Sequence, residues 1–274
     1  VVHQMVRETG GVGVYLDSTF ETHFDLGKTA PDTLSFETKG GDLAYFVLHG
    51  PDLKHVVRRF AKLVGRAPRP PLWALGYHQC KWSYAPESEL RKVAGELRSR
   101  KIPADGLWLD IDYMDGFRSF TWSPTAFPNP KAMLTDLEQQ GFKTTVIIDP
   151  GIKHDPNGSY ATYNTGAAGG HFVKDAAGQT FIGQVWPGDA VFPDFTRPAT
   201  RSWWAQEVQG LTAVGVRGVW IDMNEPTTWK PKTGFPLDSR WDGEGTQTDH
   251  REAHNVYALL MAKDRREPFD LLIT

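Results

Sequence analysis

The sequence predicts an α/β fold, a partial (β/α)₈ TIM barrel that is preceded by the end of a β-domain. From residue 72 onward, segments with strand patterns alternate with segments whose apolar residues recur at helical spacing. The strand segments 145–148 and 218–221 carry no charged side chain, as expected for strands of a parallel sheet that are buried on both faces. Acidic residues follow the ends of successive strand segments, and in a (β/α)₈ barrel that rim is the active-site face.

Residues 1–65 differ in pattern from the rest of the chain and predict a separate β-domain. Short alternating runs at 12–16 and 43–48 are typical of antiparallel strands. Residues 52–64 then carry apolar side chains at helical spacing, which predicts a short amphipathic helix. Because a proline-dense connector follows, we expect two domains, residues 1–65 and 66–274.

The second domain is predicted to alternate between strands and helices along its length. We expect strands at 72–78, 106–112, 143–149, 216–223 and 268–274. We expect helices at 86–100, 129–140, 196–214 and 248–263, the second of which turns Met133, Leu134 and Leu137 inward. Residues 150–195 are dense in Gly and Pro and predict a long loop.

Composition and charge exclude several classes of function. The net charge is -3 with both signs interspersed, which is not the basic footprint of a nucleic-acid-binding protein. The sequence has no apolar stretch that would span a membrane and no signal-peptide pattern at its start. Its single cysteine, Cys80, is expected to be a small buried hydrophobe, and the absence of a disulfide favours a cytoplasmic location.

Acidic residues at the predicted strand ends, in a chain with ten tryptophans, are suited to a reaction at a sugar. Hydrolysis of a glycosidic bond needs a carboxylate that attacks the anomeric carbon and a carboxylic acid that protonates the leaving oxygen. Alternation along the strand at 216–223 places Trp220, Asp222 and Asn224 on one face, so Asp222 is the best candidate for the attacking group. The alternative is a structural aspartate that caps the turn at Pro226.

Seven segments of the sequence resemble those of glycoside hydrolase family 31, in that family's order. One of them is WIDMNEP at 220–226, which is similar to the family's nucleophile signature. The others are LWALGYHQCKWSY at 72–84, IPADGLWLDIDYMDGFRSFTW at 102–122, FPNP at 127–130, IIDPGI at 147–152, VWPGDAVFPDF at 185–195 and HNVYALLMA at 254–262. The resemblance implies that the chain runs from the end of an N-terminal β-sandwich domain through the first half of the catalytic barrel.

The resemblance also implies a role for individual residues. Asp222 matches the catalytic nucleophile of a retaining mechanism with a covalent glycosyl-enzyme intermediate, and Asp110 matches the residue that holds sugar hydroxyls. The positions that match the substrate-binding wall and lining are Ile111, Ile152, Trp82, Trp186, Trp220, Met223 and Trp229. The positions that resemble supports of the strand-end geometry are Asp112, Asp149 and Glu225.

The substrate that the resemblance implies is an oligosaccharide with a terminal α-linked glucose. The run DMNEP after a Trp-Ile pair is similar to the α-glucosidase branch of the family. The family's acid/base aspartate follows a segment that residues 266–274 resemble, so we expect it outside this chain and expect the isolated chain to have little or no activity. An α-xylosidase or transglucosidase of the same family, or a non-catalytic sugar-binding remnant, stays open as an alternative.

Other chemistries have weaker support in the sequence. Glu225 follows Asp222 too closely to reach the opposite side of a glycosidic oxygen, so we interpret it as a supporting residue and not as the proton donor. His250 and His254 have the spacing of two metal ligands, but no third ligand accompanies them, and we predict neither a metal nor a cofactor. An aldolase or isomerase would need a lysine or a metal at the predicted strand ends, and none of these strand ends offers one.

Overall fold

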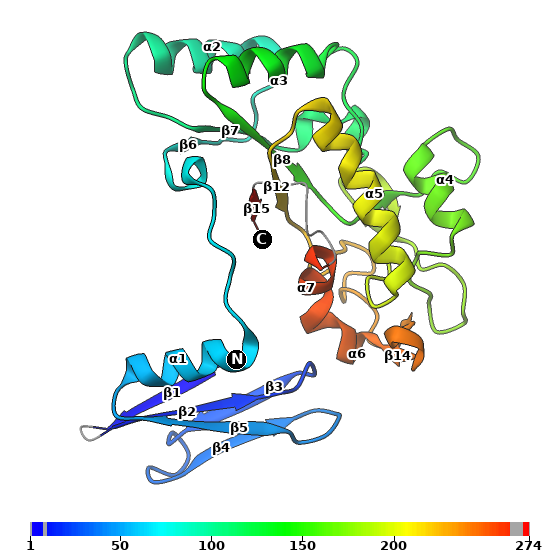
Figure 1. Ribbon diagram of the computed structural model, residues 1–274. Helices are drawn as coiled ribbons and strands as arrows, with labels where there is room; N and C mark the ends of the chain where they lie inside the picture. The colour runs from blue at the N-terminus through cyan, green and yellow to red at the C-terminus, as the bar shows by residue number, and fades with distance from the viewer. Residues whose placement is uncertain (1, 8–9, 264–270, 274) are drawn as a thin grey trace. The chain divides into compact units, whose positions relative to one another are not determined.

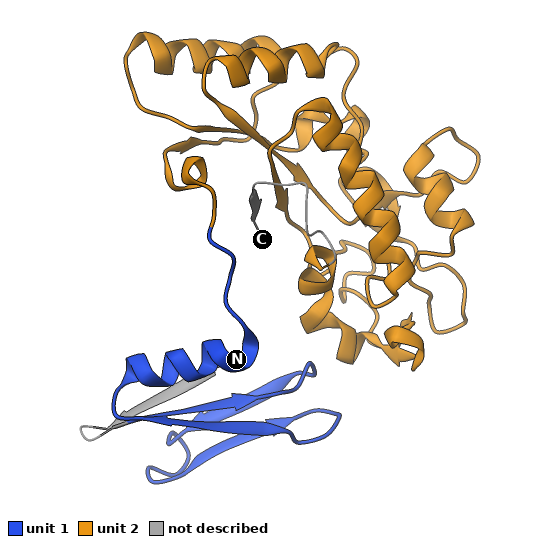
Figure 2. Cartoon of the chain, in the orientation of Figure 1, with its two compact units in different colours: residues 1–69 blue, residues 70–274 orange. Residues whose placement is uncertain are grey.

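The computed structural model describes residues 2–7, 10–263 and 271–273. The chain divides into two compact units, residues 1–69 and 70–274, with the division inside the proline-dense connector (Figure 2). None of the helices in the described part of the chain is both long and apolar enough to cross a lipid bilayer.

The first unit is built from antiparallel strands and one helix. Strands β1 (Val2–Arg7), β2 (Gly10–Leu16) and β5 (Tyr45–Gly50) form one sheet in the order β1-β2-β5. Strands β3 (Thr22–Leu26) and β4 (Leu34–Thr38) form a separate antiparallel pair. These residues therefore form a β-domain as expected, while its origin as the end of a β-sandwich stays a prediction.

Helix α1 (Leu53–Val64) covers the sheet of the first unit, as the apolar spacing predicts. The helix begins at Asp52, whose carboxylate accepts a hydrogen bond from the amide of His55 at 2.9 Å. Val56 is fully buried where α1 approaches β2. A Cβ atom on Gly13 would lie 2.8 Å from a methyl group of Val56, so the glycine permits this close packing.

The second unit contains a five-stranded parallel sheet in the order β15-β12-β8-β7-β6. Its strands are β6 (His78–Gln79), β7 (Gly106–Leu109), β8 (Lys143–Ile148), β12 (Gly218–Ile221) and β15 (Leu271–Ile273). Strands that are neighbours in the sheet also follow one another along the chain, as successive strands of a (β/α)₈ barrel do (Figure 1). The predicted α/β fold with a parallel sheet is confirmed.

Helices connect the parallel strands and bury apolar side chains against them. They are α2 (Glu87–Ser99), α3 (Pro130–Gln139), α5 (Pro198–Val214), α6 (His250–Ala253) and α7 (Tyr257–Ala262). Figure 1 shows α2 and α3 side by side on the outside of the sheet, where they contact each other. Met133, Leu134 and Leu137 of α3 are buried, as predicted.

The expectation of a loop at 150–195 was wrong, because this segment folds into elements of its own. Strands β9 (Ile152–Lys153), β10 (Gly183–Val185) and β11 (Gly188–Val191) form an antiparallel sheet, and helix α4 (Ala161–Ala168) lies between β9 and β10. The strands have two to four residues each, which is too short to produce a recognisable alternation.

The expected strand at 72–78 was also wrong over most of its length. Leu72–Leu75 form a 3₁₀ turn, and only His78–Gln79 pair with β7. Leu72 is 86% exposed, so the apolar character of this run does not reflect burial within a sheet.

Cys80, next to β6, is exposed and not the buried hydrophobe expected. For the strand expected at 268–274, Leu271–Ile273 are confirmed as β15, and the other positions lie outside the described residues.

Candidate active site

Three carboxylates follow the ends of three adjacent strands at the carboxyl end of the parallel sheet. Asp110 follows β7, Asp149 follows β8 and Asp222 follows β12. Strands β8 and β12 are paired as far as Ile148 and Ile221, and the amide of Asp222 still donates to the carbonyl oxygen of Ile148 at 3.4 Å. Neighbouring strands are about 4.8 Å apart, so the register places Asp149 directly beside Asp222.

The backbone turns sharply immediately after Asp222. Met223 has φ of 55°, the left-handed region, so the strand alternation does not continue beyond Asp222. The prediction that Asn224 shares a strand face with Asp222 was therefore wrong. The side-chain amide of Asn224 instead donates to the sulfur atom of Met261 on α7 at 3.8 Å.

Asp110 is half-buried and caps the short 3₁₀ turn that follows β7. Its carboxylate accepts a hydrogen bond from the amide of Ile111 at 2.7 Å. Burial raises the pKa of Asp110, and the negative charges of Asp112 and Asp222 raise it further. Asp222 therefore lies close enough to Asp110 to raise the pKa of Asp110, as expected if the two carboxylates face one sugar ring.

A line of three indole rings lies beside this carboxylate cluster. The ring centroids of Trp82 and Trp186 are 5.8 Å apart, and those of Trp186 and Trp229 are 4.9 Å apart with nearly perpendicular planes. The indole N–H of Trp82 donates to the carboxylate of Asp112 at 2.8 Å. Trp82 and Trp229 are 64% and 44% exposed. Large aromatic faces that are open to solvent on one side are suited to packing against the C–H face of a sugar.

A second pair of indoles lies on the face of the sheet from which the carboxylates extend. Trp108 and Trp220 lie two residues before Asp110 and Asp222, and their ring centroids are 5.7 Å apart. Alternation along a strand places each tryptophan on the same face as its aspartate. Sequence reasoning missed Trp108, although the same two-residue spacing was the signal that selected Trp220.

Trp108 is held in place by a histidine from the adjacent strand. Its indole N–H donates to Nδ1 of His78 at 2.9 Å, and Nε2 of His78 lies 3.0 Å from the carbonyl oxygen of Trp73. An indole nitrogen is only a donor, so Nδ1 of His78 is the acceptor and Nε2 carries the proton. The ring of His78 also stacks on that of Trp73. This histidine is a structural group that positions the wall of the site.

The remaining predicted site residues lie in varied surroundings. Ile111 is buried after Asp110, and Met223 is half-buried in the turn after Asp222. Ile152 is fully buried in β9 and is paired with Val191 in the small antiparallel sheet. Glu225 is exposed and accepts a hydrogen bond from the hydroxyl of Thr227 at 2.5 Å.

Of the two histidines that have metal-ligand spacing, His254 is exposed and His250 packs among aromatic rings. His250 is buried, with its ring centroid 4.6 Å from that of Phe235 and 5.6 Å from that of Trp241. Burial, and to a lesser degree the charge of His254, lowers the pKa of His250 to about 4. Within the part of the chain that the structure describes, no group of three or more His, Cys, Asp or Glu side chains is arranged to hold a metal ion.

Comparison with known families agrees with this arrangement of strands and acids. The model of the glycosyl hydrolases family 31 TIM-barrel domain matches residues 67–270. The chain belongs to glycosyl hydrolase family 31. The parallel sheet of the second unit is therefore part of a family 31 barrel, and the acids lie at the end of the sheet where barrel enzymes have their active sites.

Individual relatives within family 31 are similar over almost the whole chain. Alpha-glucosidase 2 of Bacillus thermoamyloliquefaciens is 41% identical over 94% of this chain, and the alpha-glucosidase of Saccharolobus solfataricus is 34% identical over 94%. The chain spans 32% and 39% of their lengths. The structure of a family 31 dextranase of Flavobacterium johnsoniae, complexed with glucose, is 34% identical with a TM-score of 0.81, and the match covers 91% of this chain and 30% of that one.

Proposed function

We propose that this chain carries the nucleophile side of the active site of a retaining α-glucosidase, with Asp222 as the nucleophile. The observation that carries the proposal is the position of Asp222 beside Asp149 and near Asp110 at the carboxyl end of the parallel sheet. The relatives named as α-glucosidases support the substrate class, an oligosaccharide with a terminal α-linked glucose.

The proposed reaction begins with attack of the Asp222 carboxylate on the anomeric carbon. A C–O bond forms between the carboxylate and the sugar while the glycosidic C–O bond breaks, and the leaving oxygen takes a proton from a second carboxylic acid. Water then hydrolyses the glycosyl ester and restores Asp222. The negative charge of Asp222 also stabilises the oxocarbenium-like transition state, in which positive charge develops on the sugar ring.

The neighbouring residues would bind and orient the sugar for this attack. A carboxylate such as Asp110 forms charge-assisted hydrogen bonds to sugar hydroxyls, which are stronger than hydrogen bonds between neutral groups. The indoles of Trp82, Trp186 and Trp229 would cover the apolar face of the ring and exclude water. We propose Trp220, Met223, Ile111 and Ile152 as further wall residues and Asp112 and Glu225 as supports.

A glycosyl fluoride tests this function directly in the chain. Fluoride departs without being protonated, so its release needs the nucleophile but does not need a second carboxylic acid. We expect fluoride release from α-glucosyl fluoride, at least tenfold less from α-xylosyl fluoride, and none from either with the Asp222→Asn variant. Binding of maltose without any fluoride release would contradict the proposal and support a non-catalytic sugar-binding protein.

A further inference from the structure

One oxygen of the buried Asp149 carboxyl group lacks the hydrogen-bond donor that a buried carboxylate needs. Asp149 is 6% exposed, and no hydrogen-bond partner of its Oδ1 atom lies among the residues that the structure describes. Among the described residues, no lysine, arginine or histidine forms an ion pair with Asp149. An ionised carboxylate in such surroundings is strongly destabilised, whereas a protonated carboxyl is not.

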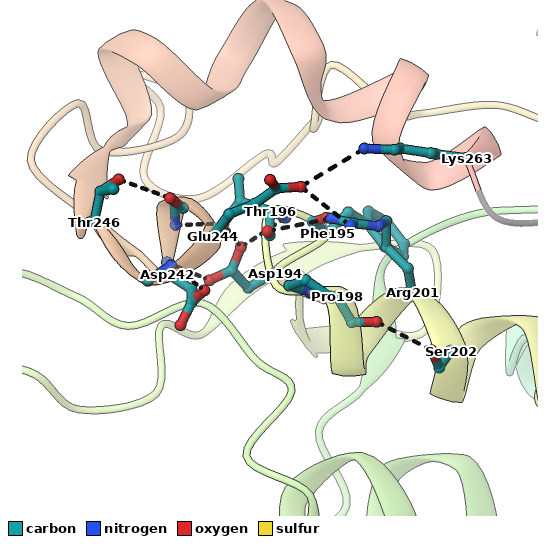
Figure 3. Close-up of polar contacts among 12 residues, drawn as sticks. Asp194, Phe195, Thr196, Pro198, Arg201, Ser202, Asp242, Glu244, Thr246 and Lys263 are labelled. Carbon is teal, nitrogen blue, oxygen red and sulfur yellow. Dashed lines mark hydrogen bonds and ion pairs between the residues drawn. The ribbon is translucent and has the colours of Figure 1, made fainter.

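Asp194 is a buried carboxyl group of the same unit whose oxygens do have hydrogen-bond donors. Asp194 is also 6% exposed, but its oxygens accept hydrogen bonds from the amide and hydroxyl of Thr196 and from the amide of Asp242 at 2.7 Å (Figure 3). These donors connect the start of α5 to residues 242–244. The two groups are equally buried, but Oδ1 of Asp149 has no such donors among the described residues, so the difference between them is not one of burial.

The polar groups around Asp149 are either negatively charged or already committed. Asp110, Asp222 and Glu225 all act on Asp149 as negative charges. The hydroxyl of Tyr113 donates its proton to the carbonyl oxygen of Ile147 at 2.8 Å. The hydroxyl of Ser119 donates to the backbone carbonyl of Asp149, at 2.9 Å, and so does not reach its carboxyl group. Among these groups of the described chain, the carboxyl group of Asp149 itself is the one that can still supply a proton.

We propose that Asp149 is a positioning residue that remains protonated at neutral pH and donates a hydrogen bond from its carboxyl group to the carboxylate of Asp222. The strand register selects Asp222 as the acceptor, because Asp149 and Asp222 extend from paired positions of β8 and β12. The inference rests on the proposed role of Asp222. The hydrogen bond would hold one carboxylate oxygen of Asp222 and leave the other free to attack the anomeric carbon.

The ionisation of the group agrees with this geometry. Burial, followed by the charges of Asp222, Asp110 and Glu225, raises the pKa of Asp149 to about 8. A hydrogen bond donated to a carboxylate favours its charged form, which is the form that attacks an anomeric carbon.

Infrared spectroscopy of the whole chain tests the proposal without reference to activity. The C=O stretch of a carboxylic acid is distinct from the bands of a carboxylate, so the wild-type minus Asp149→Asn difference spectrum at about pH 6.5 should show a carboxylic-acid band. The matched control is Asp238→Asn, which changes an exposed aspartate and should produce no such band. The wild-type band should decrease with a midpoint near pH 8.

The Asp222→Asn variant tests the coupling between the two groups. Removal of the neighbouring negative charge should lower the midpoint of the Asp149 band by at least about one pH unit. A missing carboxylic-acid band would overturn the proposal, and so would a band whose midpoint is unchanged in Asp222→Asn. If the band behaves as expected but no glycosyl fluoride reacts, the proposed function fails while the protonation of Asp149 stands.

Discussion

Replacement of Asp149 by asparagine should change how the stability of the chain depends on pH. The pKa of Asp149 is raised by folding, from the ordinary value of 3.8 to about 8. A group of this kind contributes stability that is fully present below its unfolded pKa and is lost as the pH rises through the folded pKa. Asparagine has nearly the same shape and does not titrate, so the variant should lack this loss.

The size of the effect follows from the proton that only the folded state retains. Between about pH 5 and pH 7, Asp149 is protonated in the folded chain and ionised in the unfolded chain. The free energy of unfolding therefore falls by about 1.4 kcal/mol for each pH unit of increase. Over this range the wild type should therefore lose about 3 kcal/mol of unfolding free energy relative to Asp149→Asn. Taking the difference between the two curves cancels the contributions of groups that the substitution does not affect.

Urea unfolding followed by tryptophan fluorescence is a suitable assay for this prediction. All ten tryptophans lie between Trp73 and Trp241, so the fluorescence reports on the second unit alone. The Asp238→Asn variant serves as the matched control and should follow the wild-type curve. Parallel curves for the wild type and Asp149→Asn from about pH 5 to pH 7 would contradict a raised pKa of Asp149 in the folded chain.

Three further predictions concern the core and the buried polar groups of the second unit. Folding lowers the pKa of His250 from 6.5 to about 4, so this group contributes stability that is present above pH 6.5 and is lost as the pH falls toward 4. His250→Phe should remove that loss, which urea unfolding at several pH values measures. Thr196→Val should cost about 1–3 kcal/mol in urea unfolding at neutral pH, because the amide of Gly243 loses its acceptor; a cost near zero would contradict this. Leu107→Ala, at a fully buried position of β7, should cost about 2–5 kcal/mol in the same measurement, and a cost below about 1 kcal/mol would show that β7 is not in the core.

Long elements with a clear period could be predicted from the sequence. The helix expected at 86–100 is observed as α2 at Glu87–Ser99, and the one expected at 129–140 is α3 at Pro130–Gln139. In both, the apolar residues recur on one face over three turns, so burial and sequence pattern agree. Strand β8 was also predicted to within one residue, because its apolar run is bounded by a charged residue on each side.

Elements whose partners are distant in sequence could not be predicted in this way. Strand β9 has two residues, and its pairing with Val191 depends on a segment more than thirty residues away. The run at 72–75 has the composition of a buried strand, and only the surrounding fold determines that Leu72 and Leu75 are exposed. Periodicity within a short window carries neither kind of information.

The candidate site was only partly predictable for a related reason. Alternation selected Trp220 and Asp222 together, but the left-handed backbone of Met223 ended that alternation, so Asn224 points to α7. The identity of Asp149 as an acid was visible in the sequence. Its protonation depends on neighbours from two other strands and on donors that are committed elsewhere, which only the three-dimensional arrangement reveals.

The most direct test of the account is to trap a sugar on the nucleophile. A 5-fluoro-α-glucosyl fluoride should glycosylate the chain, because the ring fluorine slows hydrolysis of the intermediate and the departing fluoride needs no proton. Peptide mass spectrometry should find the label on Asp222 and find none in the Asp222→Asn variant. A label on Asp110 or Glu225, or a chain that binds maltose and never becomes labelled, would contradict the account.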